Sequence, residues 1–159
     1  MKSKKDIGDL ENEFFDTHVA YSIVALANLI TLNTMKNILA ETQLSVNEWR
    51  ILRMTYIYNS ISAADVINIF GLDKTTTSRA ISKLGEAKLI KLSVNPRDKR
   101  QTYILLTAAG KRLHDKIILR DNISDESIEK ILSRQEIRSF HKTMNKLRLH
   151  VKDMLNVVY

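Results

Sequence analysis

The sequence predicts a mainly helical chain that contains one small β-hairpin. A single Pro and only four Gly among 159 residues favour long helices joined by short connections. Apolar residues recur at helical spacing through most of the chain, whereas two short stretches are rich in β-branched and aliphatic residues. Hydrophobic residues make up 44% of the composition, which suffices for one domain with extensions at its ends.

Residues 9–40 are predicted to form one long helix with apolar residues on several faces, which must therefore be covered on several sides. We expect this helix to be buried. The apolar run VAYSIVALANLI within it is too short to span a membrane, and Asn28 and Asn33 interrupt the run and its flank. No membrane partner is therefore expected.

A second helix is predicted to begin at Ser45, because Glu48 stands three residues later and completes a capping box. It should extend to about Tyr58, and the side chains expected to point inward are Trp49, Leu52 and Tyr56.

Two short helices joined by a tight turn are predicted next. Ser62 and Asp65 form a second capping box at the start of SAADVINIF, and Gly71 is suited to end that helix. Asp73 then caps the stretch DKTTTSRAISKL. Together these features predict a helix-turn-helix.

Two strands, LIKLSV (89–94) and TYILLT (102–107), follow the helix-turn-helix and enclose the basic turn NPRDKRQ. A helix-turn-helix followed by a hairpin with a basic tip is the winged helix-turn-helix arrangement. Thr107 should cap a further helix that extends into the 120s, and we expect the polar segment 121–127 to kink or break it.

The last helix is predicted from a capping box at Ser133 and Glu136. Its apolar positions are separated by alternating steps of three and four residues, which is the pattern of a helix that packs along another helix. They are Ile137, Phe140, Met144, Leu147, Val151, Met154 and Val158. The alternatives for the partner are residues 9–40 of the same chain and a second copy of the chain. Terminal helices this long favour the second copy.

The excess positive charge is concentrated in one segment. Residues 74–112 contain ten basic and two acidic residues, a net charge of +8, whereas the remainder has 15 basic and 16 acidic residues. A charge excess confined to the predicted winged segment indicates a polyanionic partner.

The stretches LSVNEWRIL, LDKTTTSRAISKL and NPRDKRQTYILLTAAG resemble the MarR family of bacterial transcriptional regulators. The last stretch matches the family's wing, which has an Asp-x-Arg tip, a strand and Leu-Thr-x-x-Gly. The resemblance covers residues 44–110 by motif and the rest by helix order. It implies a homodimer with an N-terminal dimerisation helix (1–40), a winged helix-turn-helix lobe (41–110) and C-terminal dimerisation helices (111–159).

Two positions depart from the family pattern. Lys88 stands where the family usually has a Gly that closes the recognition helix, and Leu92 stands where it often has Arg. Because Gly85 comes early, we expect the recognition helix to end or bend sooner than in the family.

The predicted recognition helix carries hydroxyl and basic side chains on the face away from the core. Helical spacing turns Thr77, Ala80, Ile81 and Leu84 inward. Thr and Ser can bond to several base edges, and Arg can form a bidentate pair with guanine. The residues expected to contact double-stranded DNA are Lys74, Thr75, Thr76, Ser78, Arg79, Ser82 and Lys83.

The wing supplies further DNA contacts by resemblance. Arg100 is expected to enter the minor groove, where A·T-rich sequence concentrates negative potential. Arg97 and Lys99 are expected to touch phosphates, and Asp98 is expected to support the wing by holding the loop or orienting Arg100.

Members of the family usually repress genes and often release DNA when a small aromatic or phenolic acid binds. Such an effector would lie where the dimer helices meet the DNA-binding lobe, and the side chains expected to line its site are His18, Tyr21, Trp49, Arg53 and Tyr56. An aromatic wall with one cation suits an aromatic carboxylate. The alternative for these aromatic residues is an ordinary place in the core.

Other function classes find no support in the sequence. It has no Gly-rich phosphate loop, no nucleophile elbow and no His-Glu-x-x-His motif, so no enzyme, catalytic residue or cofactor is predicted. The four His residues lack the paired spacing of a metal site, and the absence of Cys fits a reducing cytoplasm. The chain is therefore expected to be a cytoplasmic DNA-binding regulator. The alternative is a winged-helix architectural or replication protein that has no effector.

Overall fold

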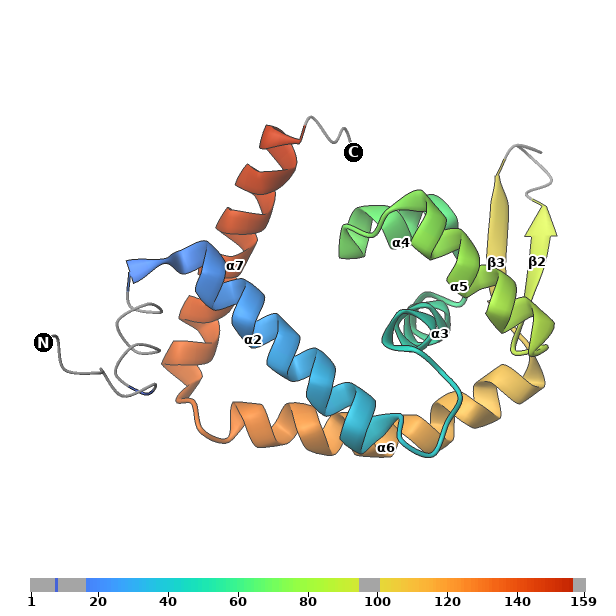
Figure 1. The fold of residues 1–159 in the computed structure, drawn as a ribbon, viewed down its shortest axis with the longest axis horizontal. Helices are drawn as coiled ribbons and strands as arrows, with labels where there is room; N and C mark the ends of the chain where they lie inside the picture. The colour runs from blue at the N-terminus through green and yellow to red at the C-terminus, as the bar shows by residue number, and fades with distance from the viewer. Residues whose placement is uncertain (1–7, 9–16, 95–100, 156–159) are drawn as a thin grey trace, which may run out of the picture. The chain divides into compact units, whose positions relative to one another are not determined.

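The structure is a computed structural model, and it describes residue 8, residues 17–94 and residues 101–155. The chain divides into two compact units, Met1–Val46 and Asn47–Tyr159, and its helices and strands are labelled in Figure 1. The three-part division predicted from the family resemblance stays a prediction.

The first unit contains helix α2 (Val19–Asn33), which continues into the π-helical turn η1 (Thr34–Ile38). The single helix predicted for residues 9–40 is interrupted at His18, which has φ −132° and ψ 85° and precedes the first residue of α2. No residue of α2 is buried, so the expectation of a buried helix is wrong for the single chain.

The apolar side chains of α2 lie on its surface, and Val19 and Leu29 are 65% and 61% exposed. By length and composition alone, Val19–Ile38 is apolar enough to cross a membrane, which differs from the prediction made from the shorter run. An apolar helix that its own chain leaves exposed requires a cover from elsewhere.

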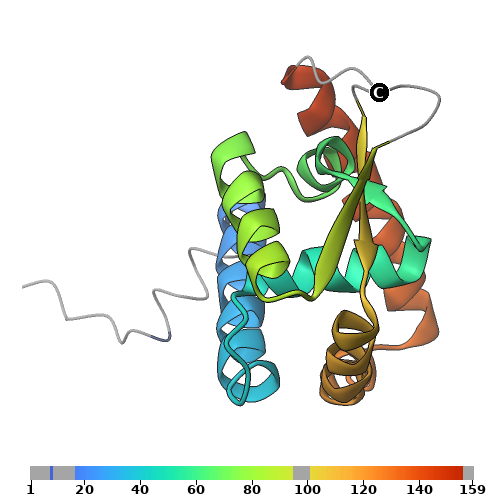
Figure 2. The same ribbon diagram turned by 90° about the vertical axis from the view of Figure 1, so that its right-hand side faces the viewer.

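The second unit contains the winged helix-turn-helix. Its helices are α3 (Val46–Tyr58, whose first residue belongs to the first unit), α4 (Ala63–Phe70), α5 (Lys74–Glu86), α6 (Ala108–Glu129) and α7 (Arg134–Met154). Its strands are β1 (Ile61–Ser62), β2 (Ile90–Val94) and β3 (Thr102–Leu106). The strands form an antiparallel sheet in the order β1-β3-β2, which can be followed beside α5 in Figure 2. The predicted hairpin is confirmed to within one residue at each end.

The turn between α4 and α5 has the predicted chemistry. The Ser62 hydroxyl accepts a hydrogen bond from the Asp65 backbone N–H, and the Asp65 carboxylate accepts one from the Ser62 N–H, which is a complete capping box. Gly71 ends α4 with φ +64°, a left-handed conformation that costs Gly little. Its N–H donates to the Ile67 carbonyl at 2.8 Å.

The core of this unit lies between α3, the sheet and α5, which is the predicted recognition helix. Its fully buried side chains include Ile51, Leu52, Leu84 and Ile104. Tyr56, which was predicted to point inward, is instead 39% exposed. Thr55 takes the inward position three residues after Leu52, and its hydroxyl donates to the Ile51 carbonyl at 2.8 Å.

Helix α6 runs without a break from its N-cap Thr107 to Glu129, so the predicted kink or break at 121–127 is wrong. The buried positions Gly110, His114, Ile117 and Asp121 follow one another at steps of four, three and four residues. Asp121, the first residue of the polar segment, continues the buried stripe of the helix, because it accepts hydrogen bonds from side chains of α3.

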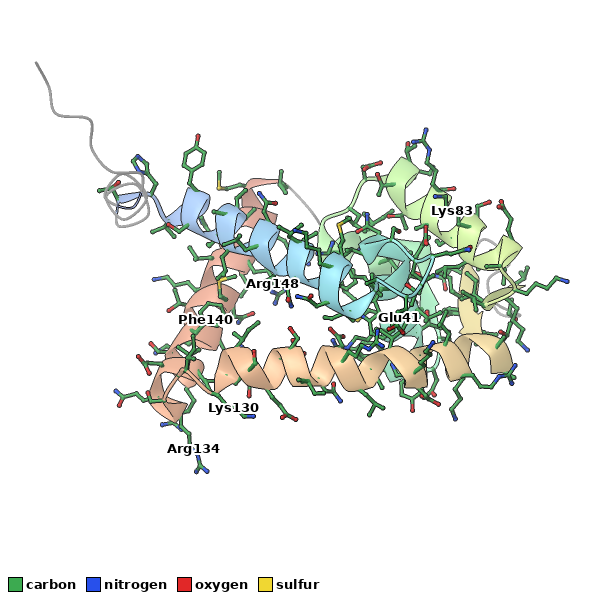
Figure 3. The ribbon with its side chains drawn as sticks, turned by 60° about the horizontal axis from the view of Figure 1, so that its bottom comes forward. Glu41, Lys83, Lys130, Arg134, Phe140 and Arg148 are labelled. Atoms are coloured by element: carbon green, nitrogen blue, oxygen red, sulfur yellow. The ribbon has the colours of Figure 1, made fainter. Side chains whose placement is uncertain are left out.

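Helix α7 begins with the predicted capping box, in which Ser133 and Glu136 exchange hydrogen bonds of 2.7 and 3.2 Å. No residue of α7 is buried. Within the predicted seam Phe140, labelled in Figure 3, Val151 and Met154 are 49%, 50% and 69% exposed, and Val158 lies outside the described residues.

Candidate nucleic-acid interface

The N-terminus of α5 is held by Asp73. Its carboxylate accepts hydrogen bonds from the Thr76 backbone N–H at 2.8 Å and from the Thr76 hydroxyl at 2.5 Å. The side-chain hydrogen bond from Thr76, followed by the one from its backbone, lowers the pKa of Asp73 below its ordinary value. The Thr76 hydroxyl is therefore committed to the cap, which makes Thr76 a weaker candidate for base contact than its exposed neighbours.

Helix α5 divides into the two faces that its sequence predicts. Thr77, Ala80 and Leu84 are buried and Ile81 is half-buried. The outward residues are exposed except for the half-buried Thr76, and they are Lys74, Thr75, Ser78, Arg79, Ser82 and Lys83. A row of hydroxyl and basic side chains on a slim helix can offer donors to base edges and phosphates.

The outward side chains differ in whether they have hydrogen-bond or ion-pair partners within the protein. Ser82 donates to the Glu86 carboxylate at 3.0 Å, and the Lys83 ammonium, labelled in Figure 3, lies 3.9 Å from a carboxylate oxygen of the buried Glu48. Arg79 has no hydrogen-bond or ion-pair partner among the residues that the structure describes. Its guanidinium is therefore available to a ligand, as is the ammonium of Lys74, which is also exposed and has no such partner among the described residues.

The end of the recognition helix does not come early, so that expectation is wrong. The helix passes through Gly85 and ends at Glu86, and Lys88, the residue after the C-cap Ala87, has φ +57°. The N–H groups of Lys88 and Leu89 donate to the carbonyls of Gly85 and Leu84, both at 2.9 Å, which is the Schellman arrangement. Lys88 thus adopts the left-handed conformation that a Gly would take at this position.

The base of the wing is tied to the start of α6. The Thr107 hydroxyl donates toward the carbonyls of Lys88 at 2.8 Å and Leu89 at 3.1 Å, and it accepts from the Gly110 N–H at 3.0 Å. A Cβ at Gly110 would lie 2.0 Å from the Leu89 carbonyl oxygen. The Leu-Thr-x-x-Gly motif therefore allows the backbone at Lys88 and Leu89 to contact the first turn of α6.

The tip of the wing lies outside the described residues. The predictions for Arg97, Asp98, Lys99 and Arg100 therefore stay predictions. In the middle of strand β2, Leu92, which stands where the family often has Arg, is 58% exposed.

The candidate effector residues lie in both units. His18 and Tyr21 belong to the first unit, where their rings meet edge to face with centroids 6.0 Å apart. Trp49, Arg53 and Tyr56 belong to α3 in the second unit. Their grouping into one site stays a prediction.

The three α3 residues are engaged with α6. Trp49 is 3% exposed, and its indole N–H donates to Asp121 at 3.1 Å. Arg53 donates to Asp121 as well, and the Tyr56 ring stacks on the buried His114 ring with centroids 3.7 Å apart. Burial raises the pKa of Asp121, and the nearby Arg53 charge opposes that rise.

Sequence reasoning missed Asp121 and His114, both of which are buried polar side chains at the centre of this cluster. The available signal was their place on the apolar stripe of α6, where a polar residue must have a partner.

A cavity of about 500 Å³ opens beyond Tyr56, between the end of α3, the hairpin and the first turn of α6. It is lined by Thr55, Tyr56, Asn59, Lys91, Leu105, Leu106 and Lys111. Trp49 and Arg53 do not line it. In the part of the chain that the structure describes, no group of His, Asp and Glu could hold a metal ion.

A capped helix with an exposed row of donors, a tight Gly turn before it and an antiparallel hairpin after it define a winged helix-turn-helix protein. Residues 42–101 match the model of the MarR family. The segment that forms the winged helix-turn-helix is thus similar to MarR-family DNA-binding transcriptional regulators.

Relatives extend the likeness to most of the chain. A MarR/EmrR family regulator from Acinetobacter is 27% identical, with a TM-score of 0.80 over 87% of this chain and 98% of that one. The regulator FarR from Neisseria gonorrhoeae is 22% identical over 79% of this chain and 85% of its own. BpsR from Bordetella bronchiseptica is 19% identical, with a TM-score of 0.71 over 84% of this chain and 94% of that one. The DNA binding of BpsR is regulated by 6-hydroxynicotinic acid.

Proposed function

We propose that this protein is a homodimeric repressor that binds a pseudo-palindromic operator and leaves it when a small aromatic or phenolic acid binds. The observation that carries the DNA-binding half of the proposal is the outward face of α5, with the free guanidinium of Arg79 among exposed hydroxyl groups. It lies within the segment that holds the whole positive charge excess. The basic residues of the wing would add phosphate and minor-groove contacts.

The dimer is supported by two helices whose apolar side chains the single chain does not bury. No residue of α2 or α7 is buried, although α2 carries large apolar side chains and α7 carries an apolar seam. A second copy of the chain can cover the apolar side chains of each helix in a symmetric dimer. Two recognition helices about 34 Å apart would then read successive major grooves on one side of B-DNA.

The effector is supported by the aromatic and cationic side chains of α3 and by a relative. Trp49 and Tyr56 flank Arg53 on successive turns, and a guanidinium beside aromatic rings suits an aromatic acid. BpsR, which shares this fold, is regulated by the aromatic acid 6-hydroxynicotinic acid. A ligand that binds the DNA-incompetent form 100-fold better would weaken operator binding by about 2.7 kcal/mol.

The DNA-binding half is tested with a DNA fragment taken from upstream of the protein's own gene. Arg79→Ala should weaken binding to the cognate site by about 1–3 kcal/mol and relax the preference at particular base pairs. Lys99→Ala, which removes an expected phosphate contact, should weaken all sequences alike and lower the salt slope by about one unit. Equal losses on specific and random DNA for both variants would contradict base readout by Arg79.

The effector half is tested by titrating operator binding against a panel of aromatic acids. At least one acid should lower operator affinity in the wild type, and Arg53→Ala should respond less while its ligand-free DNA binding stays nearly intact. A panel with no active compound would favour an architectural winged-helix protein without an effector. A normal response by Arg53→Ala would place the effector elsewhere on the protein.

A further inference from the structure

Asp121 occupies an unusual position for a carboxylate. It lies in the middle of α6 and is 6% exposed, and it accepts hydrogen bonds from two side chains of α3. One is the indole N–H of Trp49 at 3.1 Å, and the other is the guanidinium of Arg53. Arg53 also reaches Asp125, whose side chain is 58% exposed, at 3.4 Å.

These two donors form a ready receptor for an acid group. A guanidinium supplies charge-assisted hydrogen bonds to a carboxylate, and an indole N–H can only donate. The His114 ring stacks on Trp49 with centroids 5.5 Å apart, so the receptor has an aromatic wall. In this chain the acid group already in the receptor is the protein's own.

We infer that Asp121 is an internal competitor for the acid group of the effector and therefore sets which effectors this protein accepts. The inference rests on the proposed function, since it concerns the residues proposed there to bind the effector. Trp49, Arg53 and Asp121 all lie in the second unit, so the competition does not depend on how the two units are arranged.

The competition follows from charge, because Asp121 already accepts hydrogen bonds from both donors. Two carboxylates that share one guanidinium at contact distance repel each other, so an incoming acid must displace Asp121 or bind with it protonated. A neutral phenol or amide of the same shape meets no such repulsion. The wild type should therefore discriminate against charged acids, and a variant without the Asp121 carboxylate should accept them.

The test uses benzoate as the probe and benzamide as its neutral counterpart, with the full chain throughout. Trp49 is the single tryptophan of the sequence, so its fluorescence reports on this receptor directly. Asp121→Ala should bind benzoate at least about tenfold more tightly than the wild type, since one pKa unit of electrostatic interaction corresponds to a factor of ten. Benzamide should distinguish the two proteins by less than about threefold, because it carries no charge.

Two further variants separate the receptor from general effects. Asp125→Ala removes the exposed partner of the same arginine and leaves Asp121 in place, so its benzoate affinity should stay near that of the wild type. Asp121→Asn keeps the size of the side chain and an acceptor for the Trp49 N–H, and it serves if Asp121→Ala does not fold. Benzoate should also raise the melting temperature of the Asp121 variants more than that of the wild type, because it restores an anion beside Arg53.

The outcomes distinguish this inference from the function it rests on. Equal benzoate affinity in the wild type and both Asp121 variants, or no binding to those variants, overturns the inference. Tight benzoate binding by the Asp121 variants that leaves operator affinity unchanged upholds the competition but contradicts the effector half of the proposed function. Tight binding that also lowers operator affinity supports both.

Discussion

Gly85 and Gly110 lie inside helices of the second unit, and replacing each of them with Ala should change stability in opposite directions. Gly85 lies near the end of the recognition helix, and an added Cβ would meet no heavy atom within 4 Å. Gly110 lies in the first turn of α6, and its Cβ would lie 2.0 Å from the Leu89 carbonyl oxygen. Helix propensity alone predicts a gain of up to about 1 kcal/mol in the free energy of unfolding at both positions.

For Gly110→Ala the contact outweighs the propensity. Carbon–oxygen contacts are normally about 3.3 Å or longer, so the two backbone segments must separate by more than about 1 Å. Forcing an extra carbon against backbone costs about 1–3 kcal/mol or somewhat more, and the hydrogen bonds from the Thr107 hydroxyl to this segment contribute about 1 kcal/mol that would be weakened. Subtracting the propensity gain leaves a loss of about 1–3 kcal/mol, which corresponds to a melting temperature about 2–12 °C lower for a chain of this size.

Urea denaturation at one fixed protomer concentration measures this difference, with Trp49 fluorescence and far-UV circular dichroism as the two probes. Gly85→Ala should be more stable than the wild type by about 0.5–1 kcal/mol and serves as the matched control. If Gly110→Ala proves as stable as the wild type, the Leu89 carbonyl does not approach α6 closely in the folded protein.

Three further predictions concern the helix ends and the seam of α7. Met144→Lys should place a charge in the proposed dimer interface and yield monomer or unfolded chain, and a normal dimer in sedimentation would count against that interface. Lys88→Gly should raise the free energy of unfolding by about 1 kcal/mol in denaturant titrations, because it relieves a left-handed conformation that a side chain disfavours. Hydrogen bonds from Thr76 lower the folded-state pKa of Asp73, so this carboxylate stabilises the protein above its ordinary pKa of 3.8 and loses that effect as the pH falls through the folded-state pKa. Asn keeps the cap but does not titrate, so the stability advantage of the wild type over Asp73→Asn should shrink below pH 3.8, and an advantage independent of pH would contradict the assignment.

The short-range chemistry of the sequence predicts much of the fold. Capping boxes at Ser62 and Ser133 and the N-cap at Asp73 place three helix starts within one residue, because these signals act through hydrogen bonds three residues apart. Strand β1 has only two residues and shares Ser62 with the cap of α4, so it is too short to leave a pattern. Its pairing with β3 is decided by tertiary contact.

The errors occur where side chains are satisfied by partners far along the chain. The polar segment after residue 120 was expected to break α6, but Asp121 bonds to Trp49, 72 residues earlier. Helical periodicity alone also could not decide between Thr55 and Tyr56 as the inward residue, because both are spaced for contact with Leu52. The outward face of α5 could be predicted because it depends on the period of one helix, whereas the engagement of Arg53 depends on α6.

The backbone contact between the base of the wing and the start of α6 determines whether the winged helix-turn-helix can be separated from the rest of the chain. The Thr107 hydroxyl bonds both to the carbonyl of Lys88, which follows the recognition helix, and to the N–H of Gly110 in the first turn of α6. Gly110, which has no side chain, lets the Leu89 backbone before strand β2 approach α6 closely. A chain cut after residue 110 would retain the cap residue but lose the helix it caps, and with it the buried side of α6. The DNA-reading lobe is therefore not an interchangeable module, and a chimaera that grafts it onto another dimer should carry α6 along.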